Sequence, residues 1–127
     1  MPFRLHLMAA GQSAQEASAS TGGGSVALVA VGTNQATALQ LSSSQNTITT
    51  SSSGTGVKLP PCAEGNWLLI YNLSGQTQTI YTNETTGVTI NAAVAGSTGV
   101  SLGNTKTAIC FAPSYNTWVV TCALTST

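Results

Sequence analysis

The side chains that most often carry hydrolytic or acid–base chemistry are scarce in this chain. Such chemistry uses paired carboxylates, a Ser-His-Asp or Cys-His arrangement, or a bound metal ion. The 127 residues include no aspartate and one histidine, His6, which lies in the N-terminal segment. The three glutamates, Glu16, Glu64 and Glu84, fall in that segment or in predicted loops. The sequence therefore predicts that the protein is not an enzyme, because a catalytic site would need residues borrowed from a second subunit.

The three cysteines lack the paired spacing of a structural zinc site, and the absence of aspartate argues against calcium. Their odd number excludes a complete set of internal disulfides. Cys110 and Cys122 lie on the two arms of a predicted hairpin, where a cross-strand bridge is geometrically conceivable, although reduced core thiols are favoured. The glycine run at residues 22–24 precedes a valine-rich strand, without the lysine of a phosphate-binding loop. We expect no metal and no cofactor.

The charge pattern argues against nucleic acid as a partner. Charged residues make up 5% of the chain, and three basic residues balance three acidic ones, whereas soluble domains typically contain about 25%. Arg4, Lys58 and Lys106 lie far apart, and nucleic-acid binding needs clustered cations. A chain with so little charge lacks self-repulsion, which favours assembly. A threonine-rich secreted domain is the alternative interpretation of this composition.

Neither a signal peptide nor a membrane span is predicted. The first ten residues are a poor match to a signal peptide, and no run reaches the ~20 apolar residues that cross a bilayer. We expect a protein that is made in the cytosol and does not enter a membrane.

From Ser25 onward the chain consists of short runs rich in β-forming residues, each closed by Gly, Asn, Ser or Pro. This pattern predicts an all-β fold, an antiparallel β-sandwich or small barrel of about eight strands. Residues 67–71 are the most apolar run, so we expect a central strand buried on both faces. They are predicted to form a hairpin with residues 77–82, and residues 105–112 a second hairpin with residues 117–122.

The residues before this region differ in composition. Residues 1–24 form a predicted N-terminal attachment arm, small, polar and glycine-rich after its first eight residues, with one short helix at most. Residues 25–127 form the β domain. Among the aromatic residues, which on strands are expected to be core, only Tyr115 falls in a predicted loop and is a candidate surface-binding residue.

Several short segments occur in an order that points to a family. They are Gly32-Thr33-Asn34-Gln35-Ala36-Thr37-Ala38-Leu39, Gly54-Thr55-Gly56-Val57-Lys58-Leu59-Pro60, Gly65, Tyr71-Asn72, Ile80-Tyr81, Ile90-Asn91, Phe111 and Trp118. Over roughly residues 25–120 this order resembles a module common in virion proteins of tailed bacteriophages. The resemblance implies a small β-sandwich or barrel, often trimeric, and supplies no active-site residues.

The resemblance implies a virion structural protein, a head decoration (cement) protein or a head-fibre component assembled in the host cytoplasm. Its expected partners are the major capsid protein or another virion protein, and two further copies in a homotrimer. Pro2, Phe3, Leu5 and Leu7 would bury apolar surface against the partner, with Arg4 as the one charged contact. The alternative is a receptor- or glycan-binding module of a tail fibre, in which Tyr115 would contact the ligand.

Overall fold

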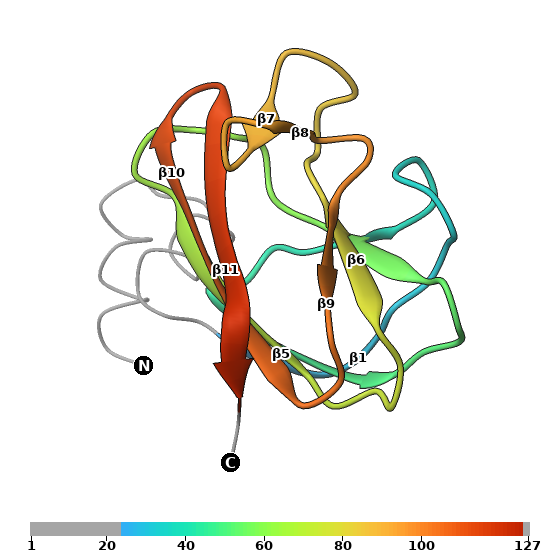
Figure 1. Cartoon of the computed structure of the whole chain (residues 1–127). Coiled ribbons are helices and arrows are strands. Elements are labelled where there is room, and N and C mark those ends of the chain that lie inside the picture. The colour runs from blue at the N-terminus through green and yellow to red at the C-terminus, as the bar shows by residue number, and fades with distance from the viewer. Residues whose placement is uncertain (1–23, 126–127) are drawn as a thin grey trace, which may run out of the picture.

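The computed structural model describes residues 24–125, and these form eleven strands without a helix (Figure 1). The predicted arm, residues 1–24, lies outside the described residues except for Gly24. The strands are β1 (Gly24–Val29), β2 (Leu39–Gln40), β3 (Gln45–Thr50), β4 (Gly56–Lys58), β5 (Trp67–Asn72), β6 (Gln78–Tyr81), β7 (Thr89–Ile90), β8 (Val94–Ala95), β9 (Val100–Leu102), β10 (Lys106–Ser114) and β11 (Thr117–Thr125). The predicted all-β class is confirmed.

The strands form two sheets. The long sheet has the order β1-β3-β5-β10-β11-β7-β8, and the short sheet has the order β2-β4-β6-β9. In Figure 1, β6 and β9 lie on one side of the molecule, and β5, β10 and β11 lie on the other. Inward side chains of both sheets, among them Ile70 and Trp118 from the long sheet and Val57 and Ile80 from the short sheet, form one apolar core.

The predicted antiparallel arrangement is wrong, because both sheets are mixed. The pairs β1–β3, β3–β5, β2–β4, β4–β6 and β11–β7 are parallel, and the other four pairs are antiparallel. From β1 to β6 the chain crosses to the other sheet after every strand, so successive strands of one sheet run in the same direction. Alternation of apolar and polar residues has the same period in both kinds of sheet and does not distinguish them.

The hairpin predicted between residues 67–71 and 77–82 is also wrong, because β5 lies in the long sheet and β6 in the short one. The buried side chain of Asn72 organises the connection. Its Nδ2 donates to the carbonyl oxygens of Gln76 at 2.7 Å and Leu102 at 3.0 Å. These bonds hold the loop in a crossover between sheets in place of a tight turn. The second predicted hairpin, β10 with β11, is confirmed.

Strand β5 is central, as predicted, since it lies between β3 and β10. It is buried on one face only, which corrects the expectation of two buried faces. Leu68 and Ile70 point into the core and are 0–1% exposed, whereas Trp67 is 47% exposed. The short sheet packs against only one side of the long sheet, and this leaves the other side as an outer face.

Candidate functional site

The two described glutamates lie in loops. Glu64 is exposed in the loop before β5. Glu84 follows β6, and its Oε2 accepts a hydrogen bond from the backbone N–H of Cys62 at 2.9 Å. Residues 24–125 contain no group of three or more His, Cys, Asp or Glu that could hold a metal ion, and no helix able to cross a membrane. The carboxylate of Glu84 thus anchors the loop that contains Cys62.

The cysteines are free thiols whose surroundings favour the protonated form. Burial raises the pKa of Cys110 far above its usual range, and the neighbouring Cys122 adds a smaller effect in the same direction. Burial also raises the pKa of Cys122. The pKa of Cys62 is raised by burial and, to a smaller extent, by the negative charge of Glu84. Catalytic cysteines have lowered pKa values, so these thiols are not poised as nucleophiles.

The raised pKa of Cys110 predicts a loss of stability in alkaline solution. Above about pH 8.5 the thiol ionises in the unfolded chain but stays protonated in the native core. The free energy of unfolding should therefore fall by roughly 1.4 kcal/mol per pH unit between pH 9 and 11 on account of this thiol. Urea denaturation at several pH values measures the slope. The variant Cys110→Ala should have a shallower slope, and an identical slope in both proteins would contradict the assignment.

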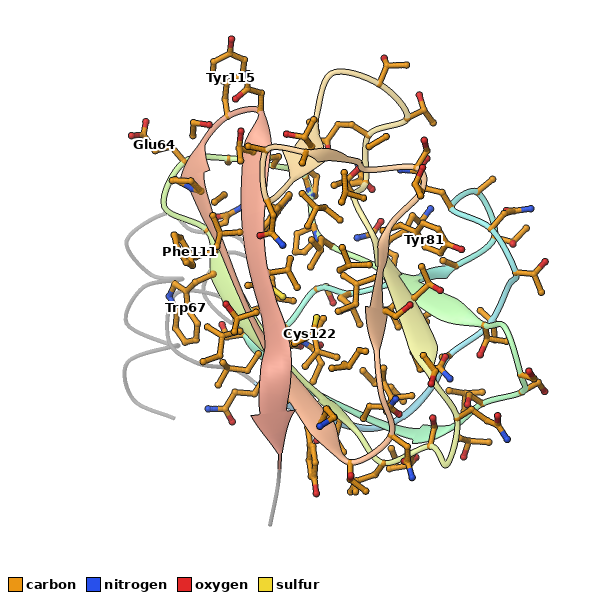
Figure 2. The ribbon with its side chains drawn as sticks, in the orientation of Figure 1. Glu64, Trp67, Tyr81, Phe111, Tyr115 and Cys122 are labelled. Carbon is orange, nitrogen blue, oxygen red and sulfur yellow. The ribbon has the colours of Figure 1, made fainter. Side chains whose placement is uncertain are left out.

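Tyr115, the candidate binding residue, lies at the turn between β10 and β11 and is 76% exposed. Figure 2 shows its ring pointing away from the body of the protein. The turn beneath it is held by Asn116, whose Oδ1 accepts from the hydroxyl groups of Ser114 at 2.9 Å and Thr117 at 3.2 Å. The ring of Tyr115 is therefore accessible to a ligand, and hydrogen bonds hold the turn that carries it.

A larger surface lies on the outer face of the long sheet. We call this surface the outer patch, and it consists of Trp67, Leu69 and Tyr71 on β5, Ile109 and Phe111 on β10, and Val119 on β11. Strand pairing places Phe111 directly between Trp67 and Val119, and Ile109 directly opposite Leu69. Figure 2 shows Trp67 and Phe111 side by side, away from the short sheet. The outer patch is therefore one continuous apolar surface across three neighbouring strands.

The outer patch exposes enough apolar area to bind an apolar segment. Trp67 is 47% exposed and Phe111 is 44% exposed, so with side-chain areas of about 150–250 Å² the two rings present roughly 200 Å² to water. Covering that area is worth about 5 kcal/mol before entropy is counted. Ordering opposes this by about 1–2 kcal/mol for each residue fixed, so a covering segment must be short and must bury apolar side chains of its own. Lys106 is the only charged residue in the described strands β3, β5, β10 and β11.

Sequence reasoning missed the outer patch because it assigned strand aromatics to the core. Along β10 the large side chains Ile109 and Phe111 are 40% and 44% exposed, while the small Ala108 and Cys110 are fully buried. On the adjacent strand β11 the inward positions carry larger side chains, since Cys110 pairs with the buried Val120 and Trp118 lies two residues before Val120. Alternation of large and small apolar residues over positions 107–112 was the available signal, although it does not say which set points inward.

The remaining predicted site residues cannot be compared with the fold. Pro2, Phe3, Arg4, Leu5 and Leu7 lie outside the described residues. Of the predicted positions, Tyr115 alone is placed, and it lies on the turn whereas the outer patch lies on the sheet face. No protein-family model matches the chain, and neither a curated protein nor a solved structure matches it.

Proposed function

We propose that this chain is a structural protein of a tailed-bacteriophage virion, a head decoration (cement) protein or a head-fibre component. It joins the particle in the host cytoplasm, contacts the major capsid protein or another virion protein, and assembles as a homotrimer. The observation that supports the proposal is that the two longest segments of the family resemblance, as far as the structure describes them, shape a loop and the short sheet.

The first shared segment shapes a loop. Gly32 has a φ of 75°, and a Cβ at this position would overlap the backbone of Thr37. Asn34 closes the turn, since its Oδ1 accepts from the N–H of Thr37 at 3.1 Å. The buried Gln35 then joins the loop to the end of β6, because its Nε2 donates to the carbonyl oxygen of Thr82 at 2.6 Å. Each of these roles is structural.

The second shared segment shapes the short sheet. Gly56 lies in β4 opposite Thr79 of β6, and a Cβ there would come within 2.5 Å of the Thr79 carbonyl oxygen. Val57, the next residue, is fully buried in the core. A sequence pattern that specifies close backbone packing in an almost uncharged body suits a rigid building block.

Attachment is assigned to the N-terminal arm. Pro2, Phe3, Leu5 and Leu7 would bury apolar surface against the partner protein, and Arg4 would make the one charged contact. The β domain would then be the part displayed on the particle, with the Ser- and Thr-rich loops facing solvent.

The arm is tested by incorporation into particles. Full-length protein with Phe3→Ser, Leu5→Ser and Leu7→Ser, or with residues 1–24 deleted, should be depleted about tenfold or more from purified particles, because its attachment surface is lost. The matched control is Ala14→Ser, Ala17→Ser and Ala19→Ser in the same arm. Quantitative mass spectrometry of the particles measures incorporation, and circular dichroism checks the fold. Wild-type incorporation of the first variant would refute attachment through the arm.

A second candidate function rests on the exposure of Tyr115. An aromatic ring that is 76% exposed on a hydrogen-bonded turn suits contact with a sugar face, as in a receptor- or glycan-binding module of a tail fibre. The isolated protein would then adhere to host cells, and Tyr115→Ala would abolish adhesion without affecting incorporation into particles.

A further inference from the structure

The chain enters the β domain next to the outer patch. The first residue of β1, Gly24, pairs with Gln45 of β3, and Gln45 pairs with Leu69 of β5. Neighbouring strands are about 4.8 Å apart, so Gly24 lies roughly 10 Å from Leu69 across the sheet, at the same level along the strands. Trp67 is two residues from Leu69 on the same face. The described part of the chain therefore begins beside the exposed aromatic rings of the long sheet.

The composition of the preceding segment complements the outer patch. Phe3, Leu5, Leu7 and Met8 supply large apolar side chains, and they are followed by a small, glycine-rich stretch at residues 9–23. Met8 is sixteen residues before Gly24, and a random coil of this length has a root-mean-square span of about 22 Å. This span exceeds the roughly 10–15 Å between Gly24 and the strands that carry the outer patch. The apolar end can thus reach the patch without strain.

We propose that residues 1–23 fold back over the outer face of the long sheet in the isolated subunit, with Phe3, Leu5 and Leu7 covering Trp67, Ile109 and Phe111. A tethered segment competes at an effective concentration on the order of millimolar, far above the protein concentration in most preparations. The same chain therefore covers the patch in preference to a second copy. Arg4 faces no like charge there, because Lys106 at the start of β10 is the only charge in the neighbouring strands.

This inference goes beyond the proposed function and does not depend on it, since it concerns the isolated chain. It adds a step to that function: the arm leaves its own sheet before it contacts the particle, and the uncovered patch then faces the same neighbour. Substitutions in the patch should release the arm without altering its sequence. These substitutions distinguish covering of the patch from attachment to the particle, because an arm that is released but unaltered in sequence still binds a particle.

Trypsin tests the covering directly, because Arg4 is the only lysine or arginine in residues 1–23. Cleavage after Arg4 in the purified full-length chain is followed by intact mass. The variant Trp67→Ser with Phe111→Ser should be cut there about tenfold faster than the wild type, since proteolysis follows the population of the open form. The matched control Tyr115→Ser removes an exposed aromatic residue outside the patch and should leave the rate unchanged. Additional cuts at Lys58 or Lys106 would reveal unfolding.

Tryptophan fluorescence supplies a second measurement that leaves the sheet unaltered. Trp118 is fully buried, so acrylamide quenching reports mainly on Trp67. Replacing Phe3, Leu5 and Leu7 by serine should increase quenching about threefold, and the alanine-to-serine control in the same arm should not. Equal cleavage and equal quenching in the wild type and the variants would overturn the proposal. Protection from trypsin or acrylamide that disappears on hundredfold dilution would also overturn it. That result would show that a second copy of the chain covers the outer patch.

Discussion

Replacing Trp118 by alanine is expected to lower the free energy of unfolding by about 3–5 kcal/mol. Its side chain is fully buried and is the largest in the core between the two sheets. It lies on β11 and pairs with the buried Ile90 of β7, so the cavity would open where the long sheet changes from antiparallel to parallel pairing. Neighbouring strands are fixed by their ladders and can collapse only in part. Urea denaturation at pH 7 measures the loss.

The control for Trp118→Ala is Tyr115→Ala, three residues earlier on the exposed turn. Because Tyr115 is 76% exposed, its removal should change the free energy of unfolding by no more than about 0.5 kcal/mol. Losses of similar size in the two variants would contradict the placement of Trp118 inside and Tyr115 outside.

Substitution of Gly99 by alanine is expected to destabilise the protein by about 3 kcal/mol or more. Two effects add at this position. The φ of Gly99 is 74°, a left-handed conformation that costs a side-chain-bearing residue about 1–2 kcal/mol. A Cβ there would also lie 2.7 Å from the carbonyl oxygen of Ile80, a backbone atom of β6 that cannot move without disturbing the short sheet. Thermal and urea denaturation measure the change.

Gly75 separates the two effects. Its φ is 85°, yet a Cβ at Gly75 would meet nothing within 4 Å. Gly75→Ala should therefore show only the conformational cost of about 1–2 kcal/mol. If Gly99→Ala were no more harmful than Gly75→Ala, the close approach of Gly99 to β6 would be refuted.

The positions of most strands could be predicted from the sequence, but their pairing could not. Strand β5 and the β10–β11 hairpin stand out through their apolar content and a turn at Asn116. The parallel pairing of β1, β3 and β5 depends on crossovers to the other sheet. The crossover after β5 depends on Asn72, which in the sequence alone is typical of an ordinary turn. Its burial and its bonds to Gln76 and Leu102 become visible only once both sheets exist.

The candidate site was predictable to a similar degree. Tyr115 was expected on the surface because loop residues are exposed, and this is where the structure places it. Trp67 and Phe111 were expected in the core, since hydrophobicity alone gives no sign of which face of a strand is covered. In the structure the small residues of β10, Ala108 and Cys110, take the buried positions, and the large ones take the exposed positions.

The proposed role of a displayed building block calls for a rigid body. Its buried polar side chains bond to loops and strand ends: Thr55, for example, donates to Oε1 of the fully buried Gln78 at 2.7 Å. Hydrogen bonds such as this one make the body rigid, because breaking them would leave buried groups unpaired. Rigidity together with one apolar face and one apolar arm suits a subunit that is completed by contacts with a larger particle.

Membership of the virion is tested most directly by the distribution of the unaltered protein between particles and soluble lysate. Tailed-phage particles are purified by density-gradient centrifugation from cells that produce the chain, and an antibody against residues 25–127 follows the protein across the gradient. The protein is predicted to band with the particles at a constant ratio to the major capsid protein and to resist washing in high salt, because an apolar attachment is not screened. Recovery of the protein only in the soluble fraction would contradict the proposed function.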